Sequence, residues 1–410
     1  MKTTAQHPFD LPFEVRDNQL LINGIPLVLL AERVGQTPFY AYDRSLISQR
    51  VAQLRAALPS EIHLHYAVKA NPMPALVQHM AGLVDGFDVA SAGEMQTVLD
   101  TAMPPAKVSF AGPGKSEKEL RQAAAAGIVV NLESAREMEV LAKISVELGV
   151  TPKAAVRVNP DFELKSSGMK MGGGPKQFGI DAEQVPTVLE RMKALAVEFH
   201  GFHIFSGSQN LKAESIMEAQ EKTFELAARL AAHAPRPVRL LNLGGGFGIP
   251  YFPGEQPLDL ARVGEHLATL MPKARADFPE AEFVIELGRY LVGEAGIYVA
   301  RVVDRKISRG QVFLVADGGL HHHLSASGNF GQVIRKNYPA LVGNRVMSET
   351  PETASVVGPL CTPLDMLADK MELGHAREGD LIIILQSGAY GLTASPRAFL
   401  SHPDAVEALV

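Results

Sequence analysis

Two charged side chains stand at the ends of short apolar runs, where they could act on a bound small molecule. Lys69 closes the run Ile62–Lys69. A lysine in such a place either extends to solvent or is held with altered basicity, as imine-forming lysines are. Glu286 closes the run Phe283–Glu286. A buried carboxylate needs a cationic partner, which is either nearby Arg289 or a protonated heterocyclic nitrogen.

A triple glycine, Gly244–Gly246, directly follows the run Leu240–Leu243. Backbone N–H groups in such a turn can close on a phosphate, although a plain tight turn is the alternative. It is not a dinucleotide fingerprint, because the last position of that pattern is Ile249. The segment FAGPGKS (110–116) is not a nucleotide P-loop, because Ser109 stands where the first glycine belongs.

Histidine and cysteine residues are further candidates that also have ordinary interpretations. His203, in the run Gly201–Phe205, is either a catalytic group or a satisfied core histidine. His321–His323 would alternate between the faces of a strand, so we predict no metal site there. Cys361 lies in GPLCTPLD. A free cysteine is usually a small buried residue, but a loop rich in glycine and proline is an unusual place to bury one.

Composition excludes several classes of protein. The 410 residues carry a net charge of −6, which argues against sequence-independent binding to nucleic acid or anionic membranes. A single cysteine excludes an intramolecular disulfide and a cysteine-rich zinc site, and it favours the cytoplasm. The first residues lack the apolar region of a signal peptide, and no apolar run approaches the ~18 residues of a membrane span.

A repeated order of strand and then helix must position these side chains. Eight parallel strands with intervening helices over about 225 residues match a (β/α)8 barrel, with a doubly wound sheet as the alternative. Because barrel active sites lie at the carboxyl ends of the strands, the reactive side chains should gather at one rim. The predicted strands are Ile62–Lys69, Phe87–Ala90, Val108–Ala111, Ile128–Leu132, Ala154–Val158, Gly201–Phe205, Leu240–Leu243 and Phe283–Glu286.

The pattern changes after Arg289, where strand-like runs continue without regular crossover helices. We predict a barrel over residues 40–289 and a mostly β domain over 290–410 that also recruits residues 1–39. In that N-terminal segment, Leu20–Ile22 and Leu27–Leu30 both look like strands. The glycine-rich stretch 161–179 has no periodicity, and a loop of this length is usually functional or mobile.

Together these motifs resemble the fold-type III, alanine-racemase-like pyridoxal phosphate decarboxylases, which include diaminopimelate and ornithine decarboxylases. Within that family the chain most resembles the branch associated with exosortase A systems. That branch is related to the butirosin-pathway enzyme, which acts on a glutamyl group carried by an acyl carrier protein. The motifs are YAVKAN (66–71), FDVAS (87–91), RVNP (157–160), FHIFSGSQ (202–209), GGGFG (244–248), ELGR (286–289), GPLCTPLD (358–365) and SGAYG (387–391).

The resemblance implies pyridoxal 5'-phosphate as cofactor and a homodimer with shared active sites. Lys69 would form the aldimine, Glu286 would hold the ring nitrogen protonated, and His203 would stack on the ring. Cys361 would enter from the partner subunit and protonate the quinonoid intermediate. The other implied cofactor contacts are Asp88, Arg157, Ser206 or Ser208, Gly245, Gly246, Gly288, Arg289 and Tyr390. The implied substrate contacts are Arg289, Cys361, Thr362 and Tyr390.

Departures from the family pattern bear on the substrate. Diamino acid decarboxylases of the family place an acidic residue directly after the cysteine, where this chain has Thr362. Leu287 replaces the usual proline, and the substrate loop carries Lys170 and Lys176. We therefore expect decarboxylation of an L-amino acid or aminoacyl group with a neutral, acidic or carrier-tethered distal end. The alternatives are free diaminopimelate, ornithine or lysine as substrate, a racemase, and a non-catalytic scaffold that binds the cofactor.

Overall fold

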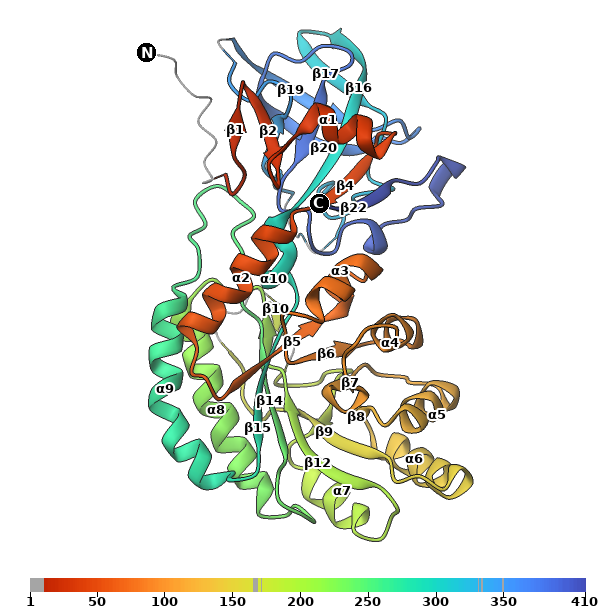
Figure 1. The fold of residues 1–410 in the computed structure, drawn as a ribbon, viewed down its shortest axis with the longest axis vertical. Coiled ribbons are helices and arrows are strands. Elements are labelled where there is room, and N and C mark those ends of the chain that lie inside the picture. The colour runs from red at the N-terminus through yellow and green to blue at the C-terminus, as the bar shows by residue number, and fades with distance from the viewer. Residues whose placement is uncertain (1–10, 165–168, 171, 331, 333–334, 349) are drawn as a thin grey trace. The chain divides into compact units, whose positions relative to one another are not determined.

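The computed structural model describes residues 11–164, 169–170, 172–330, 332, 335–348 and 350–410. The chain forms two compact units, each with its own core (Figure 1). The barrel unit comprises Arg50–Ile249 and Pro257–Tyr290. The β unit comprises the chain up to Gln49, together with Pro250–Gln256 and Leu291–Val410.

The barrel unit is built on eight parallel strands that close into a ring. Strand β9 pairs with both β8 and β12, and β15 pairs with β5, so the sheet has no open edge among these eight. This closure confirms the predicted (β/α)8 barrel and excludes the doubly wound sheet. The strands are β5 (Ile62–Ala67), β6 (Gly86–Val89), β7 (Val108–Phe110), β8 (Val129–Leu132), β9 (Lys153–Asn159), β12 (Glu198–Ile204), β14 (Leu240–Gly245) and β15 (Glu282–Leu287).

Helices follow the strands and lie outside them, as the ribbon shows for α4 to α9 (Figure 1). Ser91, Ser116 and Ser134 cap α4, α5 and α6, each accepting a hydrogen bond from the backbone N–H of a glutamate three residues on. No helix in the described part of the chain is long and apolar enough to cross a membrane. The helices are α2 (Arg44–Ala57), α3 (Pro74–Met80), α4 (Ala92–Leu99), α5 (Glu117–Ala126), α6 (Ala135–Leu148), α7 (Val185–Met192), α8 (Ala213–Ala231) and α9 (Leu260–Asp277).

The β unit is organised around one long strand, β16 (Gly296–Ser308). Its first half pairs with β4 and β21, and its second half pairs with β17. The sheet runs β18-β21-β16-β17-β19-β20, and β4 also pairs with β22. The other strands are β4 (Phe39–Tyr42), β17 (Gln311–Ala316), β18 (Ala340–Val342), β19 (Pro351–Val357), β20 (Met366–Gly374), β21 (Leu381–Ile384) and β22 (Val406–Leu409).

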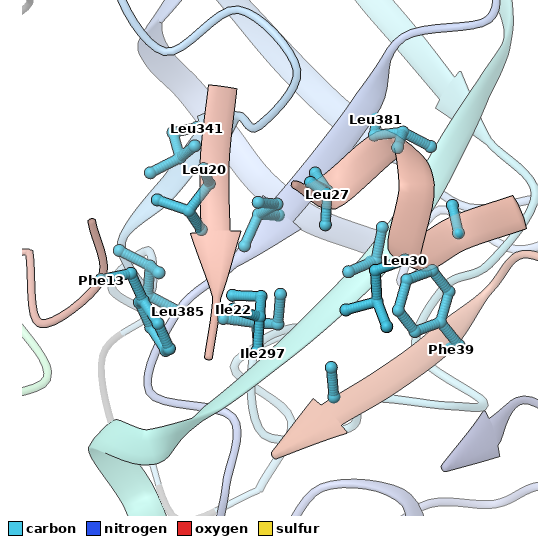
Figure 2. Packing of buried hydrophobic residues seen from close by; sticks show 14 of the residues in the cluster. Phe13, Leu20, Ile22, Leu27, Leu30, Phe39, Ile297, Leu341, Leu381 and Leu385 are labelled. Atoms are coloured by element: carbon cyan, nitrogen blue, oxygen red, sulfur yellow. The ribbon is translucent and has the colours of Figure 1, made fainter. Parts of the chain in front are cut away.

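The N-terminal segment completes the core of the β unit, as predicted. Phe13, Leu20 and Ile22 pack with side chains from β16, β18 and β21 (Figure 2). A small sheet of β1 (Val15–Arg16), β2 (Gln19–Ile22) and β3 (Ile25–Pro26) carries the last two of these residues.

The expected strand at Leu27–Leu30 is wrong, because these residues begin helix α1 (Leu27–Val34). Leu27, Leu30 and Ala31 are buried at helical spacing, one face against the core, and Gly35 ends the helix in a left-handed conformation. A short apolar run is compatible with a strand or with a buried helix face, and here the glycine after it marks a helix end.

Candidate active site

Lys69, His203 and Glu286 meet at the carboxyl ends of three barrel strands. Lys69 Nζ lies 3.7 Å from Glu286 Oε1, and His203 Nε2 lies 3.1 Å from Glu286 Oε2. Lys69 was expected to end its strand, but β5 stops at Ala67 and the lysine stands in a 3₁₀ turn, Val68–Ala70. The turn places the amine over the barrel rim, with its side chain 46% exposed while that of Glu286 is 4% exposed.

The electrostatics of Glu286 favour its ionised form. Burial alone would raise the pKa of this carboxyl group, but the Lys69 ammonium and the hydrogen bond from His203 outweigh burial and hold it well below its ordinary value. Since an ionised carboxylate only accepts hydrogen bonds, His203 Nε2 must carry the hydrogen. Arg157 also lowers the pKa of Glu286, in addition to Lys69 and His203. Arg289 as a partner of Glu286 stays a prediction.

Glycines shape the rim beside this carboxylate. Gly244 and Gly246 both have positive φ, at 71° and 73°. A Cβ on Gly245 would lie 2.1 Å from Glu286 O, and one on Gly246 would lie 2.1 Å from Gly207 O. A larger residue therefore cannot stand at either position, and such a turn can direct successive N–H groups at an anion.

Gly288, directly after β15, is another position where a side chain would not fit. A Cβ there would lie 2.9 Å from Ala70 Cβ and 3.3 Å from Ala67 O. The glycine thus lets the end of β15 approach the turn that carries Lys69. Arg289 follows directly.

Asp88 is held inside the barrel by neighbours on adjacent strands. Its carboxylate accepts a hydrogen bond from Ser109 Oγ and lies 3.2 Å from His65 Nδ1. Asn131 Nδ2 donates to the same serine oxygen at 3.1 Å. Residue types and spacing did not indicate these three side chains, because interior polar residues on neighbouring strands lie far apart in the chain.

Arg157 is fixed by Glu133, which was likewise not predicted. Arg157 Nη1 donates to Glu133 Oε1 at 2.6 Å, and both side chains are less than a tenth exposed. Glu133 also accepts hydrogen bonds from the N–H groups of Gly112, at 2.7 Å, and Gly179, at 2.6 Å. An acidic residue directly after the fourth strand is the signal that could have found it.

Replacing Glu133 by glutamine should destabilise the protein by about 3 kcal/mol at pH 7, because Arg157 loses its buried counter-charge. Burial raises the pKa of Glu133, but Arg157 and the Gly179 N–H outweigh it, so the folded pKa lies below the unfolded value of about 4.3. This stabilisation is therefore complete above about pH 4.3 and is lost as the pH falls through the folded pKa. Urea unfolding of wild type and variant from pH 7 to pH 3.5 should show that the difference between their free energies of unfolding becomes smaller as the pH falls.

The matched control for that measurement is Glu139→Gln. Glu139 Oε1 lies 2.8 Å from Arg191 Nε, but these side chains are 45% and 60% exposed. An exposed pair contributes at most about 1 kcal/mol. Equal effects of the two substitutions at pH 7, or a difference that does not depend on pH, would contradict the prediction.

Ser206 and Ser208 follow β12, and the structure places Ser208 in the short strand β13 (Gly207–Ser208). This strand pairs with β10 (Met169–Lys170), part of the glycine-rich stretch 161–179. Residues 165–168 and 171 of that predicted loop lie outside the described residues. The choice between the two serines as phosphate ligand stays open.

The FAGPGKS segment and the histidine run His321–His323 both form hydrogen bonds within the protein. Lys115 of the FAGPGKS segment is buried and donates to Gly112 O, Asn131 O and Glu137 Oε2 at 2.8–3.0 Å, so its three N–H donors are satisfied within the protein. His321 and His322 lie in turns rather than in a strand. His322 Nε2 faces Pro403 O at 2.9 Å, and His323 Nε2 faces Ser387 Oγ at 2.8 Å.

The remaining predicted residues belong to the β unit. Cys361 is exposed in the loop between β19 and β20, and Thr362 N donates to Leu360 O at 2.8 Å. Tyr390 has a positive φ of 53°, and its carbonyl accepts a hydrogen bond from Ser325 Oγ at 2.9 Å.

Comparison with known proteins gives consistent matches over almost the whole chain. A family model described as pyridoxal-dependent decarboxylase, pyridoxal binding domain, matches residues 44–293. The chain is 37% identical to the decarboxylase of L-glutamyl BtrI acyl-carrier protein from Niallia circulans, covering 91% of this chain and 89% of that one. It is 33% identical to diaminopimelate decarboxylase of Aquifex aeolicus, covering 97% and 92%.

A solved structure extends the comparison to three dimensions. Diaminopimelate decarboxylase from M. jannaschii superposes with a TM-score of 0.87 at 25% identity, covering 96% of this chain and 92% of that one. The barrel, its rim and these matches lead to one conclusion: the chain belongs to the fold-type III pyridoxal-dependent decarboxylases, and pyridoxal phosphate is its cofactor.

Proposed function

We propose that this decarboxylase removes the α-carboxylate of an L-aminoacyl group tethered to an acyl carrier protein. The observation that carries the proposal is the loop after Cys361. Thr362 is neutral, and the next acidic residue, Asp365, is 3% exposed and accepts backbone N–H groups with both oxygens. The loop therefore offers no carboxylate to bind the distal ammonium of a free diamino acid.

The relatives support this choice of substrate class. The Niallia circulans enzyme is named for a glutamyl group on a carrier protein. A glutamyl group attached through its side chain has no distal charge to anchor, which suits a neutral loop. The competing candidate is free diaminopimelate, because an enzyme named for that substrate matches at 33% identity.

The residues of the barrel rim fit the cofactor. His203 Nδ1 is buried and has no hydrogen-bond partner among the described residues, and the glycines at 244–246 form a cradle that any Cβ would fill. When bound, pyridoxal phosphate supplies an electron sink for the bond that loses CO₂. We assign the covalent anchor to Lys69, the partner of the ring nitrogen to Glu286, the ring face to His203 and the phosphate cradle to Gly245 and Gly246.

We assign the other contacts by the same reasoning. Asp88 and Arg157 are rigidly held by His65, Ser109 and Glu133 and would face the ring edge. Ser206 or Ser208, Gly288, Arg289 and Tyr390 would complete the phosphate and substrate contacts. Cys361, with Thr362 beside it, would return a proton to the substrate's α-carbon after CO₂ has left.

Release of ¹⁴CO₂ from carboxyl-labelled substrates tests the proposed substrate. The panel contains free glutamate, diaminopimelate, ornithine and lysine, and glutamate loaded on a carrier protein. We expect turnover of the carrier-bound substrate, with kcat/KM at least about a hundredfold above that of any free amino acid. Efficient turnover of free diaminopimelate would instead establish the competing candidate, and no release from any substrate would favour the non-catalytic scaffold.

Mixing two inactive variants should restore activity if Cys361 acts in the partner's site, as a homodimer with shared sites requires. Random re-association of Lys69→Ala and Cys361→Ala chains makes half of the dimers mixed, and each mixed dimer has one intact site. We therefore expect about a quarter of wild-type CO₂ release. Activity no higher than that of either variant alone would place Cys361 and Lys69 of the same chain in one site, or remove Cys361 from the reaction.

A cytoplasmic location stays a prediction, as does the branch associated with exosortase A systems.

A further inference from the structure

The loop that carries Cys361 is organised from within by one buried carboxylate. The loop spans residues 358–365, between β19 and β20. Gly358 N donates to the carbonyl of Asp365 at 3.1 Å, which closes the loop at its base. Cys361 is exposed, whereas Asp365 is 3% exposed.

The two carboxylate oxygens of Asp365 bind two different segments of the chain. Oδ2 accepts a hydrogen bond at 2.8 Å from the backbone N–H of Leu360, the residue directly before Cys361. Oδ1 accepts one from Leu320 N at 2.6 Å, in the turn after β17. The side chain thus joins the cysteine loop to the turn at Gly318–Leu320. Hydrogen bonds from N–H groups to a buried carboxylate are among the stronger ones in proteins.

Two glycines leave room for this carboxylate. A Cβ on Gly319 would lie 2.1 Å from Asp365 Oδ1, and one on Gly358 would lie 2.3 Å from Oδ2. No other residue could stand at either position without displacing the carboxylate. The glycines of the DGGL and GPLC segments therefore form a fitted enclosure around it.

The burial of Asp365 has an electrostatic consequence. Loss of hydration raises the pKa of its carboxyl group, and the N–H groups of Leu320 and Leu360 oppose that rise. The charge is satisfied inside the loop, so it is not available to a substrate.

We propose that Asp365 is a positioning residue that sets the place of the Cys361 thiol by holding the Leu360 N–H against the Gly319 turn. The proposal rests on the proposed function, in which Cys361 delivers a proton. Proton transfer needs a donor within hydrogen-bond reach of the accepting atom. A loop held at the residue next to the cysteine provides that constraint, and a loosened loop spreads the thiol over many positions.

The test uses Asp365→Asn in the cofactor-loaded protein. Asparagine has the same shape, but its amide nitrogen cannot accept the second N–H. Because Cys361 is the single cysteine of the chain, iodoacetamide reports on it alone. We expect alkylation to be about tenfold faster in the variant, the factor that one buried hydrogen bond represents. We also expect kcat to fall about tenfold or more with KM nearly unchanged.

Asp380→Asn is the matched control. Asp380 is also a buried aspartate of the β unit. It accepts hydrogen bonds from Asn344 Nδ2 at 2.9 Å and Arg377 N at 2.6 Å, and it forms an ion pair with Arg345. It should leave the alkylation rate of Cys361 unchanged. Equal alkylation rates in wild type and Asp365→Asn, or equal acceleration in both variants, would overturn the proposal.

Two further results separate this proposal from the proposed function. If Asp365→Asn accelerates alkylation but no wild-type decarboxylation is found, the positioning of Cys361 stands and the proposed function fails. If the variant does not fold, hydrogen exchange of the wild-type protein decides. The amides of Leu320 and Leu360 should then be protected at least about tenfold, and exchange at the rate of an unstructured chain would overturn the proposal.

Discussion

Lys69→Ala should lower the rate of decarboxylation by about a thousandfold or more, because the substitution removes the amine that we propose as the covalent anchor. Lys69 is the amine at the barrel rim, 3.7 Å from a buried carboxylate. Borohydride reduction followed by peptide mapping should place the mass of reduced pyridoxal phosphate on Lys69 in wild type. The variant should carry no such label, and CO₂ release gives its residual rate.

Lys107→Ala is the control for that experiment. Lys107 Nζ lies 2.7 Å from Glu282 Oε1 in the same unit, and these side chains are 35% and 44% exposed. Losing a half-exposed ion pair should leave the decarboxylation rate within about twofold of wild type. A label on another lysine, or full activity of Lys69→Ala, would refute the assignment of the anchor.

Glu286→Gln should lower kcat by about a hundredfold to a thousandfold, in the range found when a single oriented charge or donor is removed from an active site. The substitution removes the negative charge that Lys69 and His203 stabilise, and the amide cannot hold a ring nitrogen in its protonated form. Glu286→Asp keeps the charge and should retain more activity than Glu286→Gln. Steady-state kinetics of both variants in the cofactor-loaded state provide the measurement.

Glu282→Gln is the matched control, because Glu282 begins the same strand that Glu286 nearly ends. It should change kcat by no more than about twofold. If Glu286→Gln and Glu282→Gln behave alike, or if Glu286→Asp is no better than Glu286→Gln, the charge at position 286 has no part in the reaction.

The architecture could be predicted from the sequence because barrel strands read as short apolar runs with a polar residue at the end. That pattern identified Lys69, His203 and Glu286 as neighbours on one rim, and the structure brings the three together. Their roles stay predictions. Where the pattern was too short to discriminate, at Leu27–Leu30, packing against the β unit decided for a helix.

The residues that hold the site side chains in place were harder to predict than the site residues themselves. His65, Ser109 and Glu133 hold Asp88 and Arg157 from neighbouring strands, and pairing between strands brings together residues that are distant in sequence. Asp365 was visible only as the end of a motif. Its two N–H donors come from peptides 5 and 45 residues away, a relation that residue types and spacing do not encode.

The parallel pairing of β4 with β22 affects the order in which parts of the chain can fold during translation. Val406 pairs with Phe39 and Leu409 with Tyr42, so this sheet joins residues that are 367 positions apart in the sequence. All eight barrel strands lie between residues 62 and 287. During translation the barrel can therefore fold while the ribosome is still adding later residues, whereas the edge of β4 that pairs with β22 stays uncovered until residues 406–409 have emerged. An early-made edge is left temporarily uncovered, and it is the segment where chaperone protection of the nascent chain would matter most.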